Sequence, residues 1–326
     1  MDGIAQATSA ERAELFRSSA AVLRPERSPA IIEKDFWVCW TLHRTYEVLQ
    51  FRPELVFKGG TSLSKAYNAI QRFSEDVDLS LSRRDLGFAD NRDPEEEGIS
   101  RRESKRRIDA LVVACQAVIH DRLLPELRAD FTSVIGAEGW SVDLDVSDPQ
   151  TLIFTYPRSE PRATIPEAIR PAIRLEMGAR SDDWPTEERE IRPYAAEAFP
   201  AAFETRASCR AHVLDAKRTF WEKATLLHAE FHRPADRTTA DGLSRHYYDI
   251  QTVRFPDSRD SHGCILSPDG CESRCNTVAK KGTSNSRNPP TAQSYTPLTC
   301  RFPARLTGSR GHMLIFAGAK TDLRTC

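Results

Sequence analysis

One stretch of the chain limits its possible folds more than any other. An apolar segment ends at a double-glycine turn, and a helix-length segment then leads to a second apolar segment with two aspartates; the segments are Val56–Lys65 and Arg72–Leu81. This order predicts a strand, a turn, a helix and a strand. Gly59 and Gly60 let the backbone approach a phosphate closely, and a helix that begins near Thr61 or Ser62 directs free N–H groups toward it. The stretch therefore predicts a nucleotide-phosphate site.

The two aspartates of the second segment, Asp76 and Asp78, are spaced for metal binding. In a strand, alternation directs Val77 and Leu79 into the core and both carboxylates to the opposite face. Two residues of strand separate the carboxylates by roughly 6.5 Å along the chain, so both can reach one or two hard divalent cations. The spacing predicts a site for Mg²⁺ or Mn²⁺ beside the phosphate site.

The string KGGTSLSKAYNAIQRFSEDVDLSL, which begins at Lys58, resembles the signature of the AbiEii/AbiGii nucleotidyltransferase toxin family. This family is a branch of the DNA polymerase β-like nucleotidyltransferase superfamily, whose pattern is a Gly-Ser turn, a helix and Asp-x-Asp on the next strand. Gly60 and Thr61 stand at the turn here, and threonine keeps a hydroxyl that can hydrogen-bond a phosphate oxygen. The resemblance extends over roughly residues 31 to 250.

An N-terminal helix carries a second segment of resemblance. A helix is predicted over Ala10–Leu23, and another from Ser28 to about Gln50, because serine followed by proline is typical of a helix start. Within the second helix, Glu33–Trp37 resembles the EKDxW segment of the family. The simpler interpretation is that Trp37 and Trp40, at helical spacing, pack in the core while the glutamate and lysine face solvent.

Two further segments of resemblance lie near residues 220 and 250. The chain is predicted to be helical from Ala211, and Lys223 resembles the lysine of the EKxxAL motif. Leu243–Ile250 resembles the RHxYDL motif, where the family places an essential aspartate, here Asp249. The resemblance implies that Lys223 meets the phosphate charge and that Asp249 orients Lys223 or Arg245. Each residue alone is also typical of a charged helix surface.

The superfamily needs a third carboxylate on a strand beside the Asp-x-Asp strand. We predict strands at Trp140–Val146, Thr151–Tyr156 and Ala172–Met177. The order of the strands, and the segment that follows the third, resemble the family at Glu176, which shares a strand face with Arg174. Asp143 and Asp145 repeat the carboxylate alternation without a preceding glycine turn, and we therefore predict that they face solvent.

The resemblance implies a reaction and a role for each residue. An NMP would pass from an NTP to an acceptor hydroxyl with release of pyrophosphate, and Asp76, Asp78 and Glu176 would hold the metal. The alternative role of Glu176 is to polarise the acceptor hydroxyl in the manner of a general base. By resemblance the acceptor is RNA, tRNA in particular, and the protein is the toxin of a toxin–antitoxin (abortive infection) pair, with a cognate antitoxin as partner.

The residues around the glycine turn complete the predicted site. Gly60, Thr61 and Ser62 would cradle the phosphates, and Lys58 and Lys65 flank the turn and would steer the phosphate charge. Two other classes of function stay open. A nucleotide- or partner-binding module would bind NTP without releasing pyrophosphate, and a metal-dependent phosphohydrolase would use the same carboxylates with water.

Composition narrows the class of protein. The 326 residues carry a net charge of −1, so any RNA contact has to come from a local basic patch. The densest such patch is Arg101–Arg107, which has glutamates within and before it and is also typical of a solvated helix face. The chain shows neither a membrane-length apolar run nor a signal-peptide core, and its eight cysteines are interpreted as reduced thiols, which favours a cytoplasmic protein with no membrane partner.

We predict an α/β (or α+β) fold, with a small mixed sheet of nucleotidyltransferase type flanked by helices. The predicted divisions are an N-terminal helical segment (1–50), the nucleotidyltransferase core (51–200), a helical region with the lysine and Tyr-Asp motifs (201–254), and an irregular tail (255–326). The tail lacks helical or strand period and is interpreted as disordered or as a frame-shifted translation. Its Cys264, Cys271, Cys275 and His262 do not have standard zinc-site spacing.

Overall fold

The structure is a computed structural model, and it describes residues 1–51, 54–161, 169–180, 184–203, 207–234 and 242–253. These residues belong to one compact unit, Met1–Phe255. The irregular tail predicted from residue 255 onward, with its cysteines, lies outside the described residues. Among the described residues, Cys39, Cys115 and Cys209 are free and buried.

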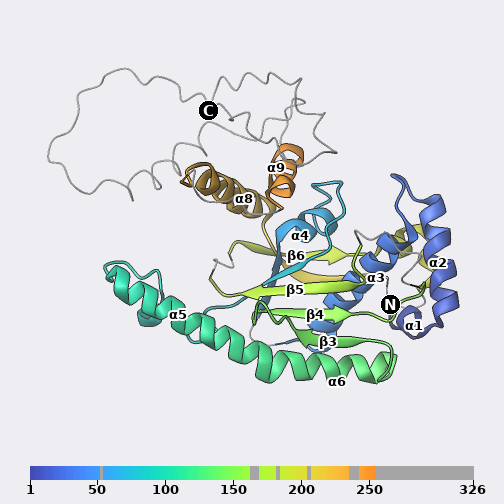
Figure 1. The fold of residues 1–326 in the computed structure, drawn as a ribbon, viewed down its shortest axis with the longest axis horizontal. Coiled ribbons are helices and arrows are strands. Elements are labelled where there is room, and N and C mark those ends of the chain that lie inside the picture. The colour runs from blue at the N-terminus through green and yellow to red at the C-terminus, as the bar shows by residue number, and fades with distance from the viewer. Residues whose placement is uncertain (52–53, 162–168, 181–183, 204–206, 235–241, 254–326) are drawn as a thin grey trace, which may run out of the picture. The chain divides into compact units, whose positions relative to one another are not determined.

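In the described part of the chain, seven strands form one mixed sheet in the order β3-β4-β5-β2-β1-β7-β6 (Figure 1). The strands are β1 (Leu55–Lys58), β2 (Val77–Leu81), β3 (Ser141–Leu144), β4 (Thr151–Thr155), β5 (Ala172–Gly178), β6 (Thr186–Ile191) and β7 (Cys209–Leu214). β2 runs parallel to β5, and β1 runs parallel to β7, whereas the other neighbouring pairs are antiparallel. This sheet and the helices around it confirm the predicted fold.

Helices make up most of the remaining regular structure. The α-helices are α1 (Asp2–Gln6), α2 (Ser9–Val22), α3 (Pro29–His43), α4 (Gly59–Lys65), α5 (Arg101–Val118), α6 (Leu124–Ile135), α7 (Tyr194–Ala198), α8 (Ala216–Phe231) and α9 (Leu243–Thr252). Thr8 and Glu11 form a capping box before α2, and the Ser28 side chain accepts a hydrogen bond from the Ile31 N–H at the start of α3. Both helices begin within a residue or so of where the sequence predicts them.

The sheet has one face packed against the hydrophobic core and one face that carries charge. α3 packs against β5 and β7, and its Trp37 and Trp40 are fully buried in the same core as Val77 and Leu79. Strand alternation places Asp78 on the opposite face. There α4 contacts β1, β2 and α8 (Figure 1). The prediction that both tryptophans are core residues is confirmed.

The charged residues in the first half of α3 are buried as well, so the prediction that the glutamate and lysine face solvent is wrong. Glu33 is 2% exposed and accepts a hydrogen bond of 2.6 Å from the Ser159 N–H. Lys34 is also 2% exposed, and it donates to the Glu75 carboxylate and, at 2.9 Å, to the Arg170 carbonyl oxygen. These partners come from distant segments, which the helical period of α3 does not reveal.

Asp35 completes this group, and we call Glu33, Lys34 and Asp35 the α3 charge cluster. The Asp35 carboxylate accepts a hydrogen bond of 2.6 Å from the Tyr194 N–H and lies 2.8 Å from the Lys65 ammonium. That ammonium is also 3.7 Å from the centroid of the Tyr194 ring. The α3 charge cluster therefore ties α4, the residues before β2 and the start of α7 to one buried helix.

The segment after residue 201 differs from the prediction, because it contributes a strand before its helices. The predicted helix start at Ala211 is wrong: β7 occupies Cys209–Leu214, and α8 begins at Ala216. Along β7, Cys209, Ala211 and Val213 are buried, while the residues between them are exposed. This period of two is the strand signal, and it was hidden by the helical period that follows. Pairing of β7 with β1 leads the chain into α8 beside the glycine turn.

The three strands predicted between residues 140 and 177 are confirmed as β3, β4 and β5. α5 begins at Arg101, so the basic residues at its start are helical. Over the described residues, every helix is too short or too polar to cross a bilayer.

Candidate functional site

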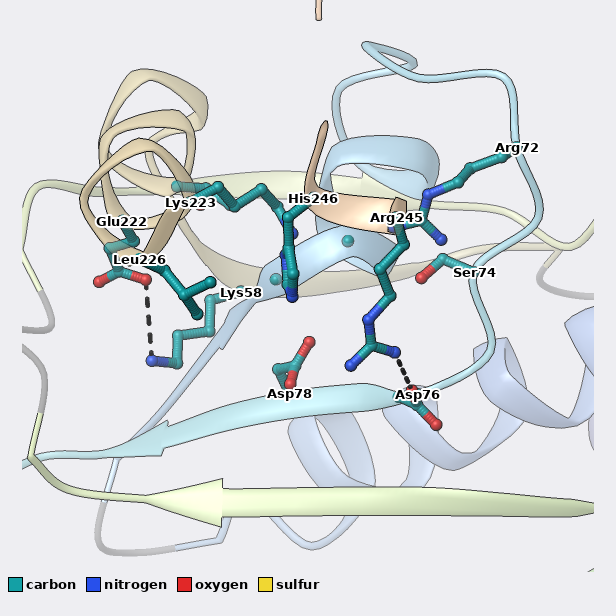
Figure 2. Close-up of a pocket in the computed structure, with 13 residues that line it drawn as sticks. Lys58, Arg72, Ser74, Asp76, Asp78, Glu222, Lys223, Leu226, Arg245 and His246 are labelled. Carbon is teal, nitrogen blue, oxygen red and sulfur yellow. Dashed lines mark hydrogen bonds and ion pairs between the residues drawn. The ribbon is translucent and has the colours of Figure 1, made fainter. Parts of the chain in front are cut away.

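A pocket lies on the charged face of the sheet, where the glycine turn, the residues before β2, α8 and α9 meet (Figure 2). It is lined by Lys58, Gly59, Gly60, Arg72, Ser74, Asp76, Asp78, Thr219, Glu222, Lys223, Leu226, Arg245 and His246. Seven of the predicted site residues are in this set, and the remaining ones, which do not line the pocket, are Thr61, Ser62, Lys65, Glu176 and Asp249.

Asp78 is directed at the glycine turn. It is the register partner of Lys58 across β1 and β2. Gly59 has a φ of +77°, which favours glycine, and a Cβ built at that position would lie 1.7 Å from Asp78 Oδ2. Any side chain at residue 59 would therefore displace the carboxylate. Glycine is required here both by the backbone conformation and by the close approach of Asp78.

The environment of Asp78 disfavours its negative charge. Burial and the neighbouring Glu176 carboxylate raise the pKa of Asp78 to about 7, and Asp76 acts in the same direction, while Lys223 and Lys58 oppose the rise. Negative charge thus accumulates at the start of β2. A cation placed between the carboxylates would relieve this repulsion.

The residues of the pocket fit a divalent cation that arrives with a nucleotide. Asp76 and Asp78 both line the pocket, and carboxylate oxygens are the ligands that Mg²⁺ prefers. Within the described ranges, no group of three or more His, Cys, Asp or Glu side chains is arranged to hold a metal ion. Mg²⁺ is commonly bound through one or two carboxylates together with substrate phosphates, so two aspartates are sufficient when a triphosphate supplies the other ligands.

Glu176 lies beside Asp78 but outside the lining of the pocket. β5 pairs with β2 so that Glu176 is the register partner of Asp78. Its carboxylate accepts a hydrogen bond of 3.2 Å from Arg174 Nε. The strand order thus places Glu176 next to the Asp-x-Asp strand, where its charge reaches Asp78. Its contact with a metal ion or an acceptor remains a prediction.

The two carboxylates of the β3 segment differ from each other. Asp143 is 57% exposed and pairs with Arg128, as expected for a solvent-facing residue. Asp145 is only 10% exposed, so the prediction that it faces solvent is wrong. Arg174 Nη1 donates to Asp145 at 2.7 Å. Hydrogen bonds from Ser147 and then from Arg174 lower the pKa of Asp145 to about 2. The strand ends at Leu144, and alternation therefore no longer sets the direction of Asp145.

Asp249 is buried outside the lining of the pocket and pairs with two of the cations that line it. Its carboxylate is 0% exposed and accepts hydrogen bonds of 2.6 Å from both Nε and Nη2 of Arg72. The Lys223 ammonium lies 3.1 Å from the same carboxylate. The structure thus brings Asp249 and Lys223 together, whereas Arg245 pairs with Asp76 at 3.0 Å (Figure 2). We call Asp249, Arg72 and Lys223 the Asp249 cluster.

His246 extends from α9 toward Asp78 (Figure 2). Its Nδ1 lies 3.4 Å from the Lys223 ammonium. Burial and then the positive charges of Lys223 and Arg245 lower the pKa of His246 to about 4. The imidazole is therefore neutral at physiological pH, and it adds no further positive charge to the pocket.

Three residues predicted to contact phosphate are used elsewhere. The Thr61 hydroxyl is buried and donates to the Asp76 carbonyl oxygen. The Ser62 hydroxyl is buried as well and donates to the Gly59 carbonyl oxygen at 3.0 Å. Lys65 is 5% exposed and pairs with the α3 charge cluster. The two hydroxyls stabilise the turn, and the Lys65 ammonium anchors α4 to α3. None of the three residues lines the pocket.

The sequence did not identify several residues that line the pocket, among them Arg72, Ser74, Glu222, Leu226 and His246. Four of them lay within the motifs: Arg72 and Ser74 in the string before Asp-x-Asp, Glu222 beside the lysine of the EKxxAL segment, and His246 in the Arg-His pair. Glu222 lies 3.9 Å from the Lys58 ammonium (Figure 2). The sequence signal that could have identified them was their position in a motif, close to residues predicted to belong to the site.

The basic residues at the start of α5 pair with nearby acids. Glu103 accepts hydrogen bonds from Arg106 and Arg107, and these lower the pKa of Glu103 to about 2. Arg107 also pairs with Glu96, and Lys105 with Asp109. This pairing is that of a solvated helix face, and contact of the face with RNA remains a prediction.

Comparison with known proteins gives a family match. A family model described as nucleotidyl transferase AbiEii toxin, type IV toxin–antitoxin system, matches residues 41–254, a range that includes every residue lining the pocket. Among solved structures, the chain is similar to MenT4, a nucleotidyltransferase toxin from Mycobacterium tuberculosis H37Rv, with 16% identity, a TM-score of 0.36 and coverage of 77% of this chain and 79% of that chain. No curated protein matches the sequence.

Proposed function

The chain belongs to the AbiEii nucleotidyltransferase toxin family of toxin–antitoxin systems, and from this premise we propose that it transfers an NMP from an NTP to a hydroxyl of an RNA acceptor, with release of pyrophosphate. The acceptor class proposed is tRNA at its 3′ end. The activity would operate in the cytoplasm and would be countered by a cognate antitoxin.

One observation carries the proposal: two carboxylates and a set of cations line the same pocket beside a glycine turn. Asp76 and Asp78 lie at the start of β2, and Arg72 and Lys223 lie over the turn, held by Asp249. A triphosphate with its cation needs both kinds of charge in one cavity, because its oxygens bind cationic side chains while the metal binds carboxylates.

Asp76 and Asp78 are the residues proposed to hold Mg²⁺ or Mn²⁺. When bound, the metal would neutralise charge that develops on the phosphates during in-line transfer. Arg245 contacts Asp76 at 3.0 Å, so this arginine is proposed to meet the triphosphate close to the metal ligands. Lys58, whose ammonium reaches toward Glu222 on α8, borders the opposite part of the pocket (Figure 2).

Glu176 is proposed to act on the acceptor rather than on the triphosphate. It is adjacent to Asp78 in register but does not line the nucleotide pocket. A carboxylate in that position can accept the proton of an incoming hydroxyl that approaches along β5. The hydrogen bond from Arg174 orients the carboxylate for this role.

The test is incubation of the full-length chain with each α-labelled NTP, Mg²⁺ and total RNA, followed by separation of the RNA species. Transfer predicts label in one class of RNA and release of unlabelled pyrophosphate. Label only in free NMP would indicate hydrolysis, and bound but unchanged NTP would indicate a binding module; either result would contradict the proposal. The Asp78→Asn variant serves as the inactive control.

A further inference from the structure

Arg72 is held at the pocket by a carboxylate that solvent does not reach. Asp249 is 0% exposed and accepts two hydrogen bonds of 2.6 Å from the Arg72 guanidinium. Arg72 is 22% exposed and lines the pocket. Two parallel N–H···O bonds to one carboxylate fix the plane of a guanidinium as well as its distance. Helix α9 thus sets the position of an arginine that lies 177 residues earlier in the chain.

The contacts of Arg72 leave donors for a ligand. A guanidinium has five N–H donors. Asp249 accepts two of them, and the Phe73 carbonyl oxygen accepts one from Nη1 at 3.3 Å. With respect to the described part of the chain, one N–H on each terminal nitrogen therefore remains. Figure 2 shows the guanidinium directed from its loop toward the interior of the pocket.

Gly60 provides the space for this guanidinium. A Cβ built on residue 60 would lie 2.7 Å from Arg72 Nη2 and 2.9 Å from Ser74 Oγ. Both distances are too short for a carbon atom, so any other residue would move Arg72 away from the turn. The second glycine of the motif therefore brings an arginine against the backbone where the phosphates are expected.

The charge balance favours an anion at this end of the pocket. Arg72 and Lys223 share the single buried carboxylate of Asp249, which leaves one positive charge in excess. Asp76 and Asp78 lie at the start of β2 and line the same pocket (Figure 2). An anion with several charges would be attracted to the Asp249 cluster and repelled by the two aspartates in the absence of a metal.

We propose that Arg72 binds the triphosphate of the nucleotide, and that Asp249 is a positioning residue that holds Arg72 and Lys223 over the glycine turn. The inference rests on the proposed function, because a triphosphate ligand follows from nucleotidyl transfer. It assigns to Asp249 no contact with the reacting atoms: its effect on turnover passes through the two cations.

The experiment measures binding of inorganic triphosphate, of NTP and of NMP to the full-length chain in the presence of Mg²⁺. Arg72→Gln is expected to weaken binding of triphosphate and NTP by about 10- to 100-fold, the loss typical of a charged hydrogen bond, while NMP binding is unchanged. The triphosphate affinity of Arg72→Lys should lie between those of the wild type and Arg72→Gln, because lysine keeps the positive charge but loses the paired N–H donors of the guanidinium. Arg84→Gln, on the exposed turn after β2, is the matched control.

Kinetics gives a second readout. Arg72→Gln should raise the KM for NTP more than it lowers kcat, and Asp249→Asn should weaken triphosphate binding at least as much. Arg72→Gln with triphosphate affinity equal to the wild type would overturn the inference, and so would an equal loss of NMP and triphosphate affinity, which indicates a structural role. If the wild-type chain binds neither triphosphate nor any NTP, the proposed function itself fails.

Discussion

The α3 charge cluster and the Asp249 cluster are built alike and differ in what surrounds them. Each contains a buried aspartate that pairs with a lysine: Asp35 with Lys65 at 2.8 Å, and Asp249 with Lys223 at 3.1 Å. Lys65 is enclosed, 5% exposed and covered by the Tyr194 ring. Lys223 lines a pocket together with a second cation on the same carboxylate.

The difference separates a charge that supports the fold from a charge that can serve a ligand. In the α3 charge cluster, the partners of Glu33, Lys34 and Asp35 are backbone groups and single side chains from segments distant in the chain. In the Asp249 cluster, two cations share one carboxylate, and part of each is directed into a cavity. Burial alone does not distinguish the two clusters, because Asp35 and Asp249 are 1% and 0% exposed.

The largest effect is expected from the carboxylates that face the pocket. Asp76→Asn or Asp78→Asn should lower transfer by about 1,000-fold or more, because each removes a ligand of the metal that stabilises transition-state charge. The folded state should persist, since neither change removes core volume. Transfer rates and melting temperatures of both variants provide the measurement. Full activity in either variant would sink the assignment of the metal ligands.

Exchange of the two buried aspartates for asparagine tests the comparison directly. Asp35→Asn leaves the Lys65 charge enclosed without its partner and should cost about 3–5 kcal/mol of stability. Asp249→Asn should cost less stability, because Lys223 and Arg72 can turn to solvent, but should lower transfer by about 10- to 100-fold. Urea denaturation and specific activity of the folded protein separate the two effects. Two results would contradict the comparison. One is that Asp249→Asn unfolds the chain while its folded fraction keeps full specific activity. The other is that Asp35→Asn is as stable as the wild type.

Substitutions of Glu176 and Asp143, which lie on the same sheet, should have smaller effects on transfer than substitutions of the two pocket aspartates. Glu176→Gln should lower turnover by about 10- to 100-fold, with less change in NTP affinity, because it removes a proton acceptor but keeps the size of the side chain. Asp143→Asn, at an exposed ion pair, should leave turnover unchanged. Asp145→Asn should have an intermediate effect through Arg174. Loss of transfer in Asp143→Asn alone would place the third carboxylate on β3.

The sequence predicted what depends on local order. Gly59, Gly60, Asp76 and Asp78 belong to one strand, turn and strand unit, and the alternation of β2 already indicates which face carries the carboxylates. The role of Thr61 was not predicted, because its hydroxyl donates a hydrogen bond to the Asp76 carbonyl oxygen, and a motif does not specify that contact. Spacing along the chain predicts direction, but it does not predict which acceptor a buried hydroxyl finds.

What the sequence missed depends on contacts between distant segments. Arg72 is assigned to the pocket only through Asp249, 177 residues later. The burial of Lys34 requires Glu75 and the Arg170 carbonyl group. Charged residues at helical spacing are typical of solvated surfaces, and only the tertiary partners reveal that these are buried. The family resemblance marked Lys223 and Asp249 correctly as neighbours, because it carried information about the fold that spacing lacks.

The smallest effect concerns pH and the stability of the metal-free protein. Burial and Glu176 raise the pKa of Asp78 to about 7, well above the usual value of about 4 for an unfolded aspartate. Between these two values the folded state binds more protons than the unfolded state, so stability falls as pH rises from about 4 to 7. Asparagine cannot ionise, and Asp78→Asn should therefore lose this part of the pH dependence, gaining about 2 kcal/mol relative to wild type above pH 7, a value reduced for partial solvent screening. Urea denaturation of both proteins with EDTA from pH 5 to 8 provides the measurement, and parallel stability profiles would show that Asp78 has an ordinary pKa.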